Sequence, residues 1–222
     1  MDGKSAGEMN NTRGLKARAL YNPPMPLTLH LIAHAATAEL RAGTFPNDEA
    51  LDARGLADAA RAATHWQWPR NAVVLSAPAL RARQTAEALG LNATAIEPAL
   101  ADLDAGRWRG QRIVAIAQDA PEQLETWIND PAAAPHGGES FVDVLQRVGA
   151  WLDALPPEGA AIVAVTHAAV LRAALAHALG TAPEAMLRID IAPLTRIVLT
   201  RSPRGWTLRL DAALAPTTSQ PG

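Results

Sequence analysis

Residues 27–34 form the run Leu-Thr-Leu-His-Leu-Ile-Ala-His, and residues 161–167 form a second run, Ala-Ile-Val-Ala-Val-Thr-His. Both runs are short, apolar or β-branched, and end in a histidine. Such runs are typical of strands buried on both faces of a parallel sheet. Ligands bind outside the carboxyl ends of the strands in these sheets. The two terminal histidines, His34 and His167, are therefore predicted to face each other over one small anion; the alternative is that each is an ordinary histidine at the end of a strand.

The rest of the chain alternates between strand-like and helical patterns. Further strand-like runs cover residues 72–76, 94–97, 195–201 and 206–210. Helical patterns cover residues 51–66, 78–89, 112–117, 121–129, 141–155 and 168–179. This alternation predicts an α/β fold of three layers, with a mostly parallel central sheet flanked by helices. The last two strands are expected to form a hairpin that adds an antiparallel edge.

The composition and charge of the chain exclude several classes of function. The chain has 222 residues, of which 49% are hydrophobic, and carries a net charge of −2. It lacks the basic field of nucleic-acid-binding proteins, and no apolar stretch is long enough to span a membrane. Cysteine is absent, which excludes disulfides and thiolate metal sites and suits a cytoplasmic protein. We expect neither nucleic acid nor membrane among its partners.

One domain is expected over residues 25–212. Residues 1–24 lack periodicity and the apolar segment of a secretory signal, and are interpreted as a disordered leader. Residues 213–222 are interpreted as a flexible tail. Met25 stands directly before the first strand, so the sequence leaves open whether the natural start is Met1 or Met25.

The segment after the second strand, residues 76–85, has the sequence Ser-Ala-Pro-Ala-Leu-Arg-Ala-Arg-Gln-Thr. Pro78 is a favourable first helical position, which places Arg81 in the first turn of a helix at the sheet edge. A guanidinium there can bind a phosphate in bidentate fashion, assisted by helix-start N–H groups. The alternative is that Arg81 is a surface charge.

Two further segments carry polar candidates. Residues 100–110 hold Asp102 and Asp104 before a Gly-Arg-Trp-Arg-Gly loop whose Trp108 is a pocket candidate. A carboxyl group here can donate a proton to a leaving oxygen, although both acids could equally be loop residues. Glu139 and Ser140 precede the long helix at residue 141. Ser140 is expected to cap that helix, whereas Glu139 holds a loop or contacts substrate.

These motifs occur in the order strand-end His, Ser-x-Pro-x-x-Arg-Ala-x-Gln-Thr, acid-x-x-x-Gly-x-Trp-x-Gly, Gly-Glu-Ser, Val-Thr-His. The chain thereby resembles the histidine phosphatase (phosphoglycerate mutase-like) superfamily over residues 27–210. The resemblance implies that His34 is a nucleophile that becomes phosphohistidine and that Asp102 is the general acid. It implies that Arg81, His167 and Thr37 contact the phosphate, together with His34.

The resemblance also implies the reaction. A neutral imidazole attacks phosphorus, cationic groups stabilise the equatorial oxygens, and the acid protonates the departing alkoxide. Neither a metal nor a cofactor is expected, and the partner is a small phosphomonoester. The family's mutases generally carry a longer insert than residues 97–138 provide, so hydrolysis is expected instead of isomerisation. The oligomeric state is left open, a homodimer included.

The first motif departs from the family pattern. The family has Arg-His-Gly, whereas this chain has Ala33-His34-Ala35 and retains Thr37. Losing one preorganised donor typically costs about 10²–10³ in rate. Three alternatives follow: another arginine fills the gap, the enzyme is slow or takes an unusual substrate, or the domain is a pseudoenzyme that binds a phospho-ligand or a protein partner. The candidate arginines are Arg41, Arg107 and Arg172.

The segment of residues 44–52, Thr-Phe-Pro-Asn-Asp-Glu-Ala-Leu-Asp, lies where the family begins its second helix. It is expected to line the mouth of the substrate site. Its acids disfavour a highly anionic substrate.

Overall fold

The computed structural model describes residues 25–93 and 95–210. The leader predicted at residues 1–24 and the tail predicted at 213–222 lie outside the described residues. Within the described ranges the elements follow one another as alternating strands and helices.

A single mixed sheet forms the centre of the domain. Its strands lie in the order β3-β2-β4-β1-β5-β6. They are β1 (Thr28–Ala33), β2 (Val73–Ser76), β3 (Ala95–Ile96), β4 (Ile162–Thr166), β5 (Arg196–Ser202) and β6 (Gly205–Arg209). The first four strands pair in parallel with one another, whereas β5 pairs antiparallel with both β1 and β6. The predicted parallel sheet with an antiparallel hairpin at its edge is confirmed.

The two strands that end in histidine are direct neighbours. β1 and β4 pair in parallel with Ala33 opposite Thr166, and both strands are almost wholly buried. Their apolar residues on both faces fit a central position, because helices cover both sides of the sheet. The His34 N–H extends the pairing by donating to the Thr166 carbonyl at 2.8 Å. His34 and His167 therefore leave the sheet at the same edge.

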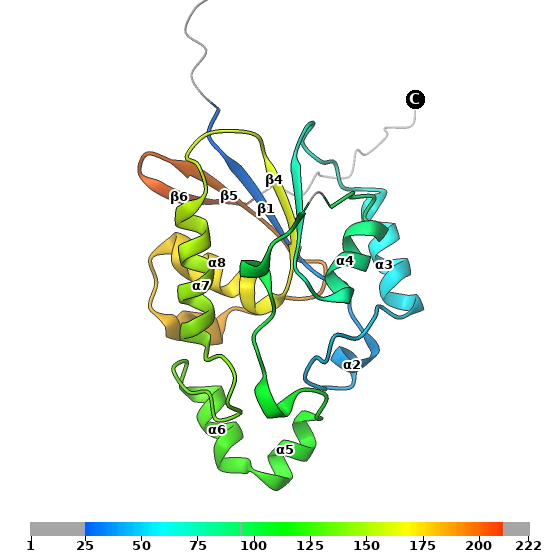
Figure 1. Cartoon of the computed structure of the whole chain (residues 1–222), viewed down its shortest axis with the longest axis vertical. Helices are drawn as coiled ribbons and strands as arrows, with labels where there is room; N and C mark the ends of the chain where they lie inside the picture. Colours follow the sequence, from blue (N-terminus) through cyan, green and yellow to red (C-terminus); the bar gives the residue numbers. More distant parts are fainter. Residues whose placement is uncertain (1–24, 94, 211–222) are drawn as a thin grey trace, which may run out of the picture.

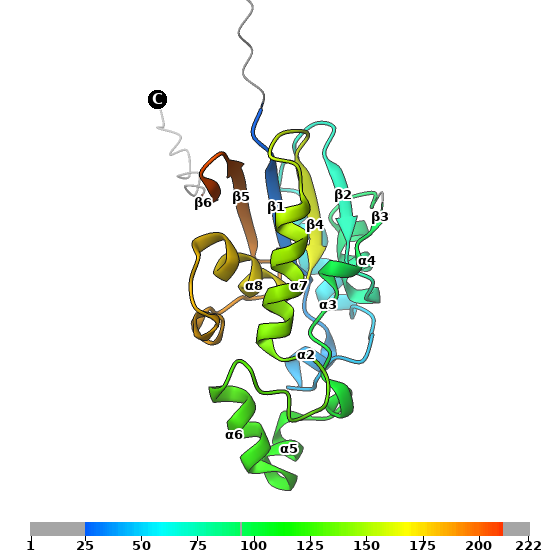
Figure 2. The same cartoon turned by 60° about the vertical axis from the view of Figure 1, so that its left-hand side comes forward.

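Helices cover both faces of the sheet (Figures 1 and 2). α3 (Ala53–Ala63) and α4 (Leu80–Ala88) lie together on one face, and α7 (Phe141–Ala154) and α8 (Ala168–Leu179) lie together on the other. This arrangement follows from right-handed crossovers between parallel strands. The predicted three-layer α/β fold is confirmed.

A helical insert lies beyond the carboxyl ends of the parallel strands, at the lower end in Figure 1. It consists of α5 (Ile113–Asp119) and α6 (Pro121–Asn129). A short helix, α2 (Ala38–Arg41), follows β1 and was not predicted, since four residues are too few for a periodic pattern. The 3₁₀ turns are η1 (Pro98–Leu100), η2 (Gly106–Trp108) and η3 (Pro183–Arg188).

Local sequence explains where the helices begin and end. Ser140 caps α7 in a reciprocal capping box with Asp143, as predicted for Ser140. α8 ends at Gly180, whose φ of +62° closes the helix in the left-handed conformation. The prediction that Pro78 is the first residue of α4 is wrong. The helix begins two residues later because the Leu80 N–H is accepted by the Asp48 carboxylate, a cap from a distant loop, at 2.7 Å.

The main core lies between the sheet and the helices, and includes fully buried leucine, isoleucine and valine side chains of β1, β4, α7 and α8. A smaller aromatic cluster lies under the insert, around Phe45, Trp108 and Trp127. None of the helices among residues 25–93 and 95–210 combines the length and apolarity that a membrane span requires.

Candidate active site

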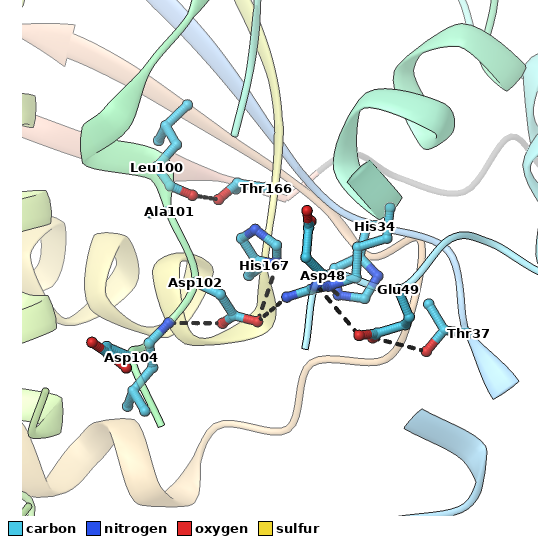
Figure 3. A network of polar contacts seen from close by, with 12 residues as sticks. His34, Thr37, Asp48, Glu49, Leu100, Ala101, Asp102, Asp104, Thr166 and His167 are labelled. Carbon is cyan, nitrogen blue, oxygen red and sulfur yellow. Dashed lines mark hydrogen bonds and ion pairs between the residues drawn. The ribbon is translucent and has the colours of Figure 1, made fainter. Parts of the chain in front are cut away.

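Four polar side chains from four chain segments converge at the carboxyl edge of the sheet. His34 follows β1, Arg81 is the second residue of α4, Asp102 follows η1, and His167 follows β4 at the start of α8. Figure 3 shows His34, Asp102 and His167 turned toward one another. The ring centroids of the two histidines are 5.1 Å apart. The structure thus brings together the four residues on which the sequence prediction depended.

The His34 ring has one nitrogen fixed and one free to react. Its Nδ1 lies 2.7 Å from the Ala35 carbonyl oxygen. A carbonyl oxygen can only accept, so Nδ1 carries the proton and Nε2 keeps its lone pair. Burial, followed by the charge of His167, lowers the pKa of His34 from 6.5 to about 4. The ring is therefore neutral near pH 7, as a nucleophile must be.

The turn after His34 is held by the second arginine motif. The Ala35 N–H donates to Thr85 Oγ1 at 3.0 Å, and that hydroxyl donates to the Arg81 carbonyl at 2.7 Å. All of these groups are buried. The nucleophile's backbone and the arginine's helix are therefore locked to each other.

The Arg81 guanidinium is almost fully buried and lies among three acceptors. Nε donates to His34 Nε2 at 3.3 Å, and Nη2 donates to Asp102 Oδ2 at 2.7 Å. Nη1 lies 3.8 Å from Oε2 of Glu49. One cation thus balances two carboxylates in the described site.

Asp102 links the arginine to the second histidine. Its Oδ2 lies 3.2 Å from His167 Nδ1, and its Oδ1 accepts from the Leu103 N–H at 2.9 Å. Burial alone would raise the pKa of Asp102, but the charges of His167 and Arg81 outweigh it and hold the pKa well below its ordinary value. Asp102 is therefore ionised at neutral pH in the site as it stands.

His167 offers an unused nitrogen. Its ring is fully buried, and Nε2 has no hydrogen-bond partner among the described residues. A buried polar atom without a partner is costly. A ligand oxygen placed between the two histidine rings would satisfy it.

A cavity of about 340 Å³ opens in front of Ala33 and His34. Arg81 borders it, together with three carboxylates, Glu49, Asp102 and Asp190. The residue that replaces the family's arginine therefore faces this cavity, in surroundings where negative side chains outnumber Arg81.

The three arginines considered as substitutes lie in different places. Arg41 borders the cavity but is paired with Asp52. Arg172 borders an adjacent cavity. Arg107 bonds Gln123 on the surface. Arg41 alone of these three borders the cavity in front of Ala33.

Thr37, which was also predicted to contact the phosphate, has its hydroxyl group engaged with α2 and Glu49. Thr37 is fully buried, its hydroxyl accepts from the Leu40 N–H at 3.0 Å as the cap of α2, and it donates to Glu49 Oε1 at 3.3 Å. Its hydroxyl proton is therefore directed at Glu49.

The predicted pocket residues lie behind the site. Glu139 accepts from Arg147 through both oxygens at 2.9 Å and from the Asp104 N–H at 3.1 Å, so it holds the Asp102–Asp104 loop. Ser140 caps α7. Trp108 is 3% exposed and packs against Phe45 in the aromatic cluster, so it supports the wall of the cleft from inside.

His34, Asp102 and His167 also meet the distance requirement for a metal site, since one ligand atom of each lies within 4.8 Å of the others. Arg81 already donates to the His34 and Asp102 atoms of that set. A divalent ion would have to displace a buried guanidinium, which makes this group a poor fit for a metal.

The sequence prediction missed the role of Glu49 as an individual residue. The segment of residues 44–52 was expected at the substrate mouth; in the structure Glu49 borders the cavity in front of His34, and Asp48 accepts from the Leu80 N–H. Which acid reaches Arg81 depends on the turn at Asp48, where φ is +59°. No periodic pattern encodes such a turn.

The geometry agrees with comparisons to known proteins. The model of the histidine phosphatase superfamily (branch 1) matches residues 29–212. A bifunctional protein of Mycobacterium tuberculosis is 35% identical over 132 residues, which is 56% of this chain and 36% of that protein. The chain therefore spans about a third of the length of this relative. Phosphoserine phosphatase 1 of Hydrogenobacter thermophilus is 27% identical over 68% of this chain and 76% of its own.

The fold has close counterparts among solved structures. A mycobacterial glucosyl-3-phosphoglycerate phosphatase, solved in complex with VO3, superposes with a TM-score of 0.71 at 26% identity and covers 82% of this chain and 97% of its own. The fold, the convergence of two strand-end histidines with an arginine and an acid, and the match of the family model over most of the chain lead to one conclusion. The chain belongs to the histidine phosphatase superfamily, branch 1.

Proposed function

We propose that this protein is a metal-independent phosphomonoester hydrolase that acts on a small phosphorylated metabolite through a phosphohistidine at His34. The observation that carries the proposal is the unprotonated Nε2 of His34, which accepts a hydrogen bond from Arg81 Nε at 3.3 Å, in a ring that faces His167. Two similar proteins are named phosphatases of phosphoserine and of glucosyl-3-phosphoglycerate, which supports the same reaction class.

In the first step, His34 Nε2 attacks phosphorus and the bond from phosphorus to the ester oxygen breaks. Arg81 and His167 Nε2 stabilise the charge on the phosphoryl oxygens. Asp102 donates a proton to the departing alkoxide. A bound phosphate places negative charge beside Asp102 and draws Arg81 toward itself, and both effects favour the protonated acid.

In the second step, water attacks the phosphohistidine. Asp102, now a carboxylate, takes the proton from the water, and the bond from nitrogen to phosphorus breaks. Inorganic phosphate and neutral His34 result. The Nδ1 proton of His34 stays on Nδ1 throughout, hydrogen-bonded to the Ala35 carbonyl, which fixes Nε2 as the reacting atom.

A second candidate function is binding of a phospho-ligand or a protein partner without turnover. It is favoured by Ala33, since the cavity there is bordered by three carboxylates, by Arg81 and by Arg41, which is paired with Asp52. A site with this balance of charge binds an anion less well than one with two free arginines.

Hydrolysis of p-nitrophenyl phosphate by the wild type and by His34→Ala, both with EDTA, separates the two candidates. Turnover that disappears in the variant, together with an acid-labile phosphoryl adduct in the wild type by intact mass spectrometry, is the expected result. Equal rates in the two proteins would favour binding without turnover. Ala33→Arg would then show whether one missing cation is the cause, because restored activity is expected only if the remaining machinery is intact.

A further inference from the structure

We propose that the alcohol part of the substrate is apolar, and that an apolar cavity beside Asp102 binds it as an alkyl or aryl chain. The proposal rests on the proposed function for the position of the phosphate. It differs from that function in assigning a substrate class, a phosphomonoester with a single anionic group and a hydrophobic leaving group.

The cavity has a volume of about 300 Å³ and lies under the helical insert. Most of its lining is apolar, including Leu40, Phe45, Leu103, Ile113, Trp127 and Phe141. Asp102, Pro46 and Ala168 border both this cavity and the one in front of His34. The two cavities are therefore adjacent, and Asp102 borders both of them, where the proposal places the oxygen that joins phosphate to alcohol.

The wall of the cavity is preformed. Phe45 and Phe141 each pack on Trp127 with ring centroids 5.4 Å apart. The backbone of Phe45 is tied to the loop before α5, since its N–H donates to the Gln111 carbonyl at 2.9 Å and its carbonyl accepts from the Gly110 N–H at 3.0 Å. A rigid apolar wall binds a chain with little ordering cost.

Two large apolar side chains that line this cavity are exposed to solvent. Leu40 is 46% exposed and Ile113 is 41% exposed, and both line it from opposite segments, α2 and α5. Exposed apolar residues are ordinary when scattered. Leu40 and Ile113, however, border the same apolar cavity next to a candidate nucleophile. Their shared position indicates a surface that a ligand covers.

Few polar groups line the cavity, so it offers few hydrogen-bond partners to a sugar or to a second anion. Besides Asp102, the polar groups of the lining are the side chains of Thr44 and Arg172 and the indole N–H of Trp127, which has no hydrogen-bond partner among the described residues. Arg172 Nε donates to the Ile189 carbonyl at 2.7 Å, and its charge interacts with Asp102 and Asp190. Glu49 and Asp190 add negative charge to the phosphate side. An alcohol with several hydroxyl groups would lose more hydrogen bonds to water than this lining can replace.

The test uses n-alkyl phosphates from ethyl to octyl, whose leaving groups differ little in intrinsic reactivity. We expect kcat/KM to rise about fourfold for each added methylene until the cavity is filled. Glycerol 2-phosphate and O-phosphoserine are expected to react at least tenfold more slowly than butyl phosphate. A series that does not depend on chain length, or a preference for the polar esters, would overturn the proposal.

Binding of n-alkylphosphonates, measured by calorimetry, separates this proposal from the proposed function. These compounds cannot be hydrolysed, so the change of their Kd with chain length reports the contribution of the apolar cavity to binding, separately from turnover. A Kd that falls several-fold per methylene in a protein that hydrolyses no ester would refute the hydrolase function and support the apolar cavity. A Kd that is independent of chain length would refute the cavity, whatever the enzyme hydrolyses.

Two neighbouring residues on α5 provide a matched pair of variants. Ile113 lines the cavity, whereas Val114, 58% exposed, does not. We expect Ile113→Asn to reduce the dependence of phosphonate Kd on chain length to less than twofold per methylene and Val114→Asn to leave it as in the wild type. An unchanged dependence in Ile113→Asn, with the fold verified by circular dichroism, would contradict the assignment.

Discussion

Arg81 Nη2 donates to Asp102 Oδ2 at 2.7 Å, so the arginine that is expected to bind phosphate helps His167 to hold the candidate general acid as a carboxylate. The two roles are coupled. When Arg81 turns to a phosphate oxygen, Asp102 loses its strongest charge-assisted hydrogen bond and gains a negative neighbour. We therefore expect substrate binding and protonation of Asp102 to occur together.

Removal of the acid should depend on the leaving group. Asp102→Asn is expected to lower kcat for alkyl phosphates by about 10²–10⁴, the usual contribution of a general acid. It should lower kcat for p-nitrophenyl phosphate much less, because p-nitrophenolate leaves without a proton. Steady-state kinetics on both esters give the comparison. Asp104→Asn is the control, since Asp104 is half-exposed and bonds Arg109. A loss that is equal for both esters would argue against the acid role.

Neutralising Glu49 should strengthen phosphate binding. Glu49 Oε2 lies 3.8 Å from Arg81 Nη1 and borders the phosphate cavity. Glu49→Gln keeps an oxygen for the Asn47 N–H and removes one negative charge, so Kd for inorganic phosphate is expected to fall about tenfold, the order given by Coulomb attraction at an intermediate dielectric. Glu122→Gln, an exposed acid on α6, controls for net charge. Weaker phosphate binding in Glu49→Gln would show that Glu49 positions Arg81 productively.

Stability should fall in acid because of His34. Its pKa is lowered from 6.5 to about 4 in the folded protein. Between these pH values the unfolded chain therefore binds more protons than the folded chain, and the free energy of unfolding decreases as the pH falls. The resulting loss for the folded state begins near pH 6.5 and is complete below pH 4, at about 3 kcal/mol. Urea unfolding of the wild type and His34→Asn from pH 7.5 to 4 measures it. The wild-type curve should fall more steeply, and parallel curves would contradict the assignment.

A glycine in the Asp102 loop should tolerate no side chain. Gly106 has a φ of +49°, and an added Cβ would meet the His136 carbonyl oxygen and would lie 2.8 Å from Gly138 N. Gly106→Ala is expected to cost about 3 kcal/mol, from the backbone conformation and the clash together. Gly90→Ala is the control, since φ there is +71° with open space around it, and about 1 kcal/mol is expected. Thermal unfolding gives both values. Equal losses would show that the loop can move aside.

The strands and long helices could be predicted because each is set by its own periodicity. The ends of β1 and β4 placed two histidines on one edge, and the helix after β2 added Arg81. These are consequences of strand direction and crossover handedness. They require no knowledge of side-chain contacts.

The contacts of individual loop residues could not be predicted in the same way. Whether Glu139 touches substrate or holds a loop depends on the position of Arg147, six residues further along α7 than its first residue, and on the fold of the Asp104 loop. The apolar cavity likewise combines α2, the aromatic cluster and the start of α8. Such surfaces arise from tertiary packing, and the sequence of any single element does not encode them.

The pairing of β1 with β4 joins segments that lie more than half the chain apart. Closing such a long loop costs entropy before any contact offsets it, and folds rich in distant contacts form slowly. During synthesis, β1 leaves the ribosome long before either of its sheet neighbours, β4 and β5, exists. The nascent chain therefore carries an unpaired apolar strand for most of its translation, and the two histidines meet only when almost the entire domain has been made.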